Sequence, residues 1–466
     1  MPRFLRSEWC SFTFLFALHN TITTNSQADI VPEFDAISKL TWISVGLVMS
    51  AAATVLLWGK IFYQFNTKWS YIISVAIFEV GSAICGAARN MVTLIVGRVL
   101  CGIGGSGLYL GVITLLSAST TLHERPMYIV STGLTWGLGM VLGPLIGGGF
   151  SQSLVGWQWA FYINLVFGGA WAPVYLFLIP NIDPCKGASF LDRALGIDYV
   201  GSVLNIGAFV SGFMASSFGD VTWAWGSARI IALFIVSGTL LILFGVQQAL
   251  PLLTTVSRRL VVVDFLKSRT MLILFAATAA ARTAAFIPMY IVPLFFQFTR
   301  GDYAFDSGVR LLPFIILYIF AIIANGVLMS KFGFYMPWYT FRGVLVLTGG
   351  ALFYTVDIDT SVARIYGFIT CSQVVGSTIA LAIANSVFLN KAQREVSKIL
   401  PDISLREVQT AIPGTGDVLA NLSESTRREV EVRIVESMGD TYIFVITAGA
   451  LTLVLCLLMK RERLFK

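Results

Sequence analysis

Charge is scarce in this sequence of 466 residues: only 12% are Asp, Glu, Lys or Arg, whereas 56% are hydrophobic. A soluble protein of this length carries about 25% charged residues, so a soluble globular protein is excluded. Histidine occurs twice, and the six cysteines are scattered without any Cys-x-x-Cys pair. Such a sequence offers little for metal or nucleophilic catalysis and indicates neither a zinc site nor a disulfide framework. We therefore expect no enzymatic activity, no bound metal and no cofactor.

The uncharged stretches of the sequence form long apolar runs. We count about thirteen runs that are long enough to cross a bilayer as helices, which predicts an all-α polytopic membrane protein in contact with lipid. The net charge of +7 fits Lys and Arg retained in cytoplasmic loops. We therefore expect no nucleic-acid partner.

The most informative run, residues 133–150, reads GLTWGLGMVLGPLIGGGF. Three of its glycines recur every four residues and so lie on one side of a helix, where a second helix can approach closely. A proline within the run removes one backbone donor and is expected to bend the helix. The residues concerned are Gly139, Gly143, Pro144, Gly147 and Gly148. Taken alone, the glycines are equally compatible with a packing seam of no functional specificity.

A second glycine cluster, GIGGSG at 102–107, matches the dinucleotide fingerprint G-x-G-x-x-G. That fingerprint requires a preceding strand and a soluble βαβ unit. Here the cluster lies inside about 27 mostly apolar residues, as expected for a membrane-spanning helix. We interpret it as a site of close helix packing.

Ionisable side chains inside apolar runs are candidate functional residues, because burying a charge in the bilayer is costly. Glu79 lies in the third run and Arg98 in the fourth, so the two side chains could pair across adjacent helices. Such a pair would serve either proton coupling or structure alone. His19, Asn20 and Thr21 make the second half of the first run polar, and polar groups at that depth should face a cavity or another helix.

The order of residues at 139–148, G-x-x-x-G-P-x-x-G-G, resembles the fifth-helix antiporter motif of major facilitator superfamily exporters. The string W-x-W-x-F-Y-I-N at 157–164 is also similar to that family. Together they resemble its fungal fourteen-helix drug:proton antiporter branch, which includes mycotoxin exporters. The resemblance implies the major facilitator fold, with a six-helix bundle at 1–180, two linking helices at 181–269 and a second bundle at 270–466.

The resemblance also implies roles for single residues. Arg98 resembles the buried arginine of the family's fourth helix, which is implicated in proton transfer. Leu18-His19-Asn20-Thr21 stands where the family has Leu-Asp-x-Thr, so a histidine replaces the acid thought to serve coupling. His19 either titrates near neutral pH or is a packed neutral side chain in a degenerated site.

The family's cytoplasmic loop motif is only partly kept in this sequence. Gly59 and Lys68 match it, Lys60 lies beside Gly59, and the stretch also reads as an ordinary positively charged turn. Other polar residues are expected in the substrate cavity. These cavity candidates are Asn20, Thr21, Arg282 and Gln297. For the arginine of the ninth run, snorkelling toward the interface is the alternative.

The resemblance breaks near residue 365. Only one run follows before the polar segment 390–440, which carries a glycosylation sequon at Asn421. Thirteen spans would place two basic termini on opposite sides of the membrane, against the positive-inside rule. We infer that one helix-sized piece is missing near residue 365, through a gene-model or splicing change or a real deletion.

The function implied is export of a small amphipathic compound, such as a drug, toxin or secondary metabolite. Proton antiport would drive it by alternating access of a central cavity, in a monomer of the plasma membrane or, alternatively, the vacuolar membrane. No cofactor is implied beyond the proton gradient. Two alternatives stay open: uptake or exchange of a solute such as a siderophore complex, and a non-transporting sensor or inactive remnant.

Overall fold

The computed structural model describes residues 3–23, 30, 33–34, 39–120, 125–151, 153–219, 222–261, 391–392, 394–400 and 422–457, with a few single positions between 263 and 310. The chain forms two compact units, one of Met1–Ala215 with Trp225–Phe265 and the other of Ser216–Ala224 with Leu266–Lys466. The predicted division of the chain at residues 180 and 269 stays a prediction.

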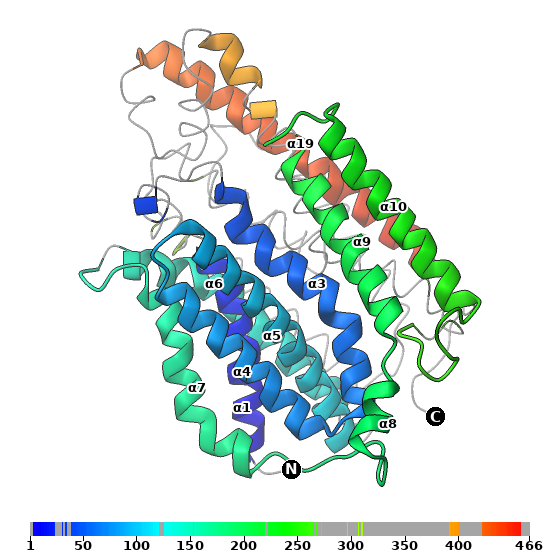
Figure 1. Ribbon diagram of the computed structural model, residues 1–466. Coiled ribbons are helices and arrows are strands. Elements are labelled where there is room, and N and C mark those ends of the chain that lie inside the picture. Colours follow the sequence, from blue (N-terminus) through cyan, green and yellow to red (C-terminus); the bar gives the residue numbers. More distant parts are fainter. Residues whose placement is uncertain are drawn as a thin grey trace. The chain divides into compact units, whose positions relative to one another are not determined.

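The described part of the first unit is helical (Figure 1). Its helices are α1 (Arg3–Thr21), α3 (Leu40–Gln64), α4 (Thr67–Gly86), α5 (Met91–Ser119), α6 (Arg125–Ser151), α7 (Trp159–Phe177), α8 (Phe190–Leu195), α9 (Tyr199–Phe218) and α10 (Ala228–Ala249). Six of them, α3, α4, α5, α7, α9 and α10, are long and apolar enough to cross a membrane. This confirms the prediction of an all-α, multi-pass membrane protein.

The spans expected between residues 270 and 388, and the missing piece near residue 365, lie outside the described residues. In the second unit the structure describes α19, Glu424–Leu457. Residues 424–440, expected within a polar loop, form the first half of this helix. Side-chain pairs one turn apart stabilise it, with Arg427 bound to Glu431 and Arg433 to Glu436, both at 2.9 Å.

Polar residues fix where several helices of the first unit begin. The Asn66 side chain accepts from the backbone N–H groups of Lys68 and Trp69 and so caps α4. Asn90 caps α5 in the same way through Thr93. Because lipid offers no hydrogen bonds, the apolar runs between such caps satisfy their backbone groups within the helix.

Glycines let α4 and α5 pack backbone to backbone. A Cβ atom added at Gly81 would lie 2.7 Å from the Cys101 nitrogen, and one at Gly97 would lie 2.9 Å from the Cys85 nitrogen. At Gly104 an added Cβ would overlap the backbone of Phe78. Small residues allow this approach where the hydrophobic drive between helices is absent.

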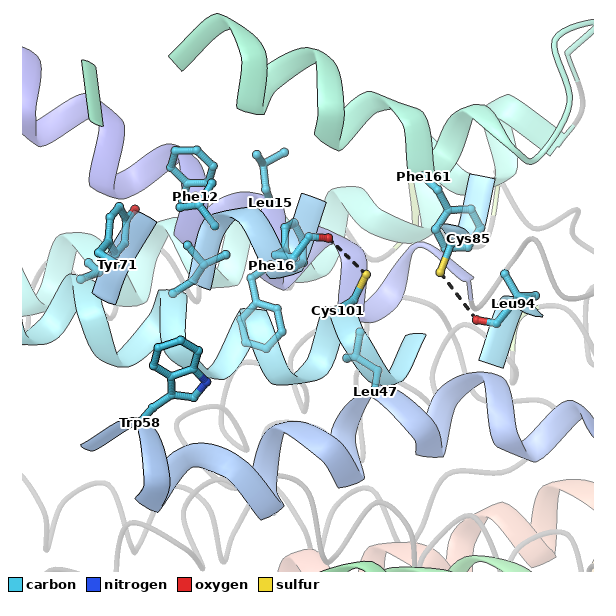
Figure 2. Close-up of a cluster of buried hydrophobic side chains, with 14 of the residues drawn as sticks. Phe12, Leu15, Phe16, Leu47, Trp58, Tyr71, Cys85, Leu94, Cys101 and Phe161 are labelled. Atoms are coloured by element: carbon cyan, nitrogen blue, oxygen red, sulfur yellow. Dashed lines mark hydrogen bonds between the residues drawn. The ribbon is translucent and has the colours of Figure 1, made fainter. Parts of the chain in front are cut away.

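The GIGGSG cluster lies wholly inside α5, which confirms that it serves helix packing. Its glycines face three different helices. Gly102 meets the Leu47 backbone of α3, Gly104 meets α4, and Gly105 meets the Phe16 ring of α1. Around this centre lies a buried aromatic core, shown in part in Figure 2.

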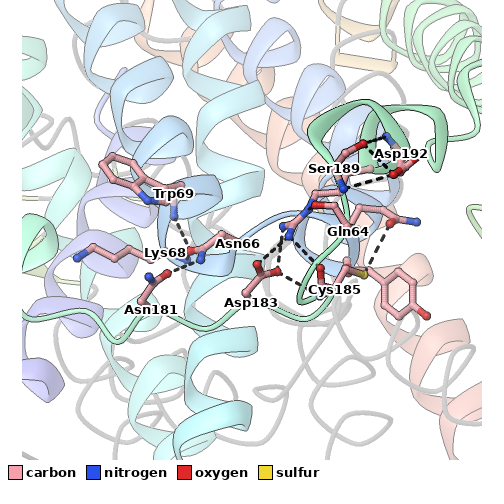
Figure 3. Close-up of polar contacts among 12 residues, drawn as sticks. Gln64, Asn66, Lys68, Trp69, Asn181, Asp183, Cys185, Ser189 and Asp192 are labelled. Atoms are coloured by element: carbon pink, nitrogen blue, oxygen red, sulfur yellow. Dashed lines mark hydrogen bonds and ion pairs between the residues drawn. The ribbon is translucent and has the colours of Figure 1, made fainter.

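The connection between α7 and α9 packs on the turn between α3 and α4 (Figure 3). Asn66 donates a hydrogen bond to Asn181, and Arg193 binds both carboxylate oxygens of Asp183 at 2.9 and 2.8 Å. The hydrogen-bonded Arg193 guanidinium lowers the pKa of Asp183 from its usual value. This pair therefore persists into mildly acidic conditions and is lost only when the pH falls through the lowered pKa.

We predict that Gly104→Ala destabilises the protein by about 1–3 kcal/mol, the typical cost of overpacking a core. The added methyl group would have to displace backbone atoms of Phe78 and Ser74. Gly59→Ala is the matched control, since its Cβ would lie 3.7 Å from Leu110, an ordinary contact. Thermal unfolding in detergent should show a lower Tm for Gly104→Ala alone. Equal Tm values for the two variants would contradict the proposed packing.

Candidate functional site

Arg98 is a fully buried charge in the middle of the first unit, with an exposed fraction of 0%. From α5, its Nε donates to the Ile43 carbonyl of α3 at 2.9 Å and its Nη1 to the His19 carbonyl of α1 at 2.7 Å. Its Nη2 donates to Thr23 Oγ1 at 3.3 Å. One guanidinium group therefore joins α1, α3 and α5.

The pairing of Glu79 with Arg98 that the sequence allowed is not made. Both carboxylate oxygens of Glu79 are buried, and neither has a hydrogen-bond partner within the described part of the chain. The side chain points to α7, where a Cβ added at Gly168 would lie 2.5 Å from Glu79 Oε1. Arg98 instead faces α1 and α3, so the two groups lie on different sides of neighbouring helices.

His19 lies inside the protein, where α1 meets α4 and α7. Its Nδ1 is 2.9 Å from the Asn164 Nδ2 atom, which also donates to Ser82 Oγ at 3.1 Å. The rings of Phe78 and Phe161 pack edge-on against the imidazole, with centroids 5.2 and 5.5 Å away. The histidine that replaces the family's acid is thus enclosed by aromatic rings and one amide.

Two cysteines lie beside this histidine. Cys85 and Cys101 each offer a sulfur atom, and these sulfurs and a ring nitrogen of His19 lie within 4.8 Å of one another. This cluster could not be predicted from the sequence, because the three residues come from three helices and their spacing matches no metal motif. The helix-packing glycines beside Cys85 and Cys101 were the only available signal.

Thr21 faces α6, and its hydroxyl group forms a hydrogen bond to the backbone of that helix. Thr21 Oγ1 donates to the Met140 carbonyl at 2.8 Å. Met140 precedes Pro144 by four residues, so its carbonyl is the one that the missing proline N–H leaves without a helical donor. The hydroxyl of α1 thus completes the hydrogen bonding of α6 at the proline.

The glycine stripe of α6 packs against the same stretch of α1. A Cβ atom added at Gly139 would lie 2.5 Å from the Phe14 carbonyl oxygen. One at Gly143 would overlap the Thr21 hydroxyl, and one at Gly147 would overlap the Ile22 carbonyl. Gly148 is buried as well. The helix that the stripe accommodates is therefore α1.

The remaining candidates are less constrained or fall elsewhere. Asn20 is half-buried. Lys60 is buried and donates to the Ser257 carbonyl at 2.6 Å, whereas Lys68 is half-buried on the first turn of α4. Three predicted residues lie outside the described part: Arg282, Gln297 and Asn421.

A buried arginine and an isolated carboxyl group within a bundle of apolar helices are ionisable residues of the kind that mark substrate or ion pathways in membrane proteins. Residues 9–398 match the Major Facilitator Superfamily, and the chain belongs to that family.

Fungal transporters are similar over nearly the whole chain. The MFS-type transporter pgmG of Aspergillus terreus is 46% identical over 97% of this chain and 87% of its own length. The efflux pump alnA of Emericella nidulans is 42% identical over 98% of this chain and 89% of its own. The Phomenoic acid biosynthesis cluster MFS-type transporter of Leptosphaeria maculans is 41% identical over 98% and 81%.

These relatives carry residues that this chain lacks. The alignment with pgmG runs over 486 positions, whereas the whole chain has 466 residues, so at least 20 positions have no counterpart here. The number is in keeping with a missing helix-sized piece. Its location near residue 365 stays a prediction.

We predict that Thr21→Val destabilises the protein by about 1–3 kcal/mol, because it leaves the buried Met140 carbonyl without a donor. Thr21→Ser is the matched control, since it keeps the hydroxyl although it is smaller. The Tm in detergent should therefore fall further for valine than for serine. The opposite order would show that packing, and not the hydrogen bond, decides stability at this position.

Proposed function

We propose that the protein exports a small amphipathic secondary metabolite in exchange for protons. Export is supported by the relatives, of which one is named an efflux pump and another belongs to a biosynthesis cluster. The observation that carries proton coupling is Glu79 of α4, whose buried carboxyl group has no hydrogen-bond partner among the described residues. We place the protein in the plasma membrane, where export leaves the cell.

An isolated carboxyl group in a membrane helix suits proton exchange. Within the described part of the chain its ionised form has no hydrogen-bond donor and is therefore disfavoured. When the helices rearrange during alternating access, α4 and α7 present the group to another environment in which the proton can leave. One group can thus bind a proton in one state and release it in the other.

Arg98 has a different role in this proposal. Its three hydrogen bonds hold α1 to α3 and α5, and α1 in turn lies along the glycine stripe of α6. The guanidinium fork supplies donors in fixed directions, which lysine cannot reproduce. Arg98 therefore positions α1, while Glu79 carries the proton.

A second candidate function is favoured by the length difference from the relatives. A chain that lacks a spanning helix has lost part of its second bundle, so it would bind compounds without transporting them, as a sensor or an inactive remnant. The two candidate functions differ in substrate flux across the membrane: an exporter produces it, and a sensor or inactive remnant does not.

The deciding experiment measures accumulation of amphipathic dyes, fungicides and fungal metabolites in yeast cells that lack their own exporters. Cells producing this chain should accumulate less of at least one compound, and a protonophore should abolish the difference. Export that withstands the protonophore would contradict proton coupling. Higher accumulation would indicate uptake, and unchanged accumulation of every compound would favour the non-transporting candidate.

We predict that Glu79→Gln reduces proton-driven efflux by about 5–150-fold, the range that coupling free energies of 1–3 kcal/mol produce. Exchange of substrate for substrate should persist in vesicles, because that half-reaction moves no proton. Glu436→Gln, at an exposed residue paired with Arg433 in α19, is the matched control. Loss of both activities in Glu79→Gln would indicate a purely structural role.

A further inference from the structure

The buried sulfur atoms beside His19 have no part in the proposed transport cycle. Cys85 of α4, Cys101 of α5 and His19 of α1 are all buried, and their ligand atoms lie within 4.8 Å of one another. Figure 2 shows the two sulfurs within the core. We propose that these three residues form a binding site for one monovalent soft metal ion, for which Cu(I) is the expected occupant.

The ligand set favours Cu(I) over zinc. Thiolates are soft ligands that suit both Cu(I) and zinc, and imidazole suits copper and zinc as well. A structural zinc site, however, takes four ligands in a tetrahedron. The group here has three members, with no fourth His, Cys, Asp or Glu among the residues that the structure describes. Three ligands match a Cu(I) ion, which does not require a fourth.

The charge of the surroundings also favours Cu(I) over zinc. Arg98 lies close enough to act electrostatically on both His19 and Cys85, and its Nη1 is bound to the His19 carbonyl. Two thiolates and Cu(I) carry one net negative charge, which the guanidinium neutralises. With Zn(II) the same group would keep one positive charge in the apolar core, and uncompensated buried charge is costly.

The distances require little rearrangement. A metal–sulfur bond of about 2.3 Å, as in zinc sites, places two sulfurs about 4 Å apart in a trigonal arrangement. The glycine contacts of Gly81 and Gly97 fix α4 against α5 at this level. Side-chain rotation alone therefore brings the sulfurs onto one ion.

Both thiol protons must leave when the ion binds. At present Cys101 donates to the Phe78 carbonyl and Cys85 to the Leu94 carbonyl, each at 3.6 Å. Binding forms two sulfur–copper bonds and one nitrogen–copper bond and releases two protons to the solvent. No electron is transferred, and binding tightens as the pH rises.

Asn164 supplies the outer contact that a metal-bound histidine needs. Its amide nitrogen meets both His19 Nδ1 and Ser82 Oγ, while its Oδ1 and His19 Nε2 have no partner within the described part. If the Asn164 side-chain amide rotated by half a turn, its Oδ1 could accept a hydrogen bond from a protonated His19 Nδ1. That contact fixes the tautomer and leaves Nε2 free to bind the ion.

The test is titration of the reduced, purified full-length protein with Cu(I) under anaerobic conditions, against a chromophoric Cu(I) chelator. The wild-type protein and Cys185→Ser, a control at a half-buried loop cysteine, should each bind one more ion than Cys85→Ser or Cys101→Ser. X-ray absorption of the wild-type complex should show two sulfur ligands and one nitrogen ligand. Asn164→Ala should weaken binding about 10–100-fold, as expected for an outer-contact residue.

Several results would overturn the proposal. Equal Cu(I) uptake by Cys85→Ser, Cys101→Ser and Cys185→Ser would do so, as would a preference for Zn(II). So would a Cys85–Cys101 disulfide that persists in the reduced preparation. Absorption spectra of the wild-type protein do not depend on how well any variant folds. Binding is measured without transport, so a failure of the export proposal leaves this test unaffected.

Discussion

Direct contact between helix backbones is the interaction on which the rest of the first unit depends. Because Gly81, Gly97 and Gly104 carry no side chains, α4 and α5 approach until their main chains touch. Side chains next to these glycines are then forced together, which is why Cys85 and Cys101 meet in the core. The polar cluster around His19 is thus a product of glycine placement as much as of the polar residues themselves.

Arg98 adds direction to this packing. Van der Waals contact between apolar helices specifies distance but only weakly specifies rotation, whereas a guanidinium with three separate acceptors requires each helix in one orientation. Its partners are mostly main-chain carbonyls, so they survive substitution of the side chains around them. That independence lets position 19 hold a histidine here without loss of the link between α1 and α5.

The sequence allowed the helical, multi-pass character of the described part to be predicted and rather less of the site. Apolar runs are sufficient to predict helices, because lipid leaves the backbone no other choice, and the spacing of Gly139, Gly143 and Gly147 was enough to predict a close contact. The spacing of these glycines did not indicate that the partner helix is α1. Because Glu79 and Arg98 lie on consecutive spans, the sequence allowed a pair between them. Whether the pair forms depends on the rotation of each helix about its own axis, and no sequence pattern encodes that rotation. The meeting of His19 with two cysteines depends on three such rotations at once.

The bond between Thr21 and the Met140 carbonyl makes two distant positions one evolutionary unit. A proline at position 144 leaves the buried Met140 carbonyl without a donor unless α1 already carries a hydroxyl group at position 21. A hydroxyl at position 21 is harmless without the proline. The threonine can therefore arise first and the proline second, but the reverse order passes through a damaged protein. Once both are present, the threonine cannot be lost alone without cost, so the proline of one helix is tolerated through a residue of another.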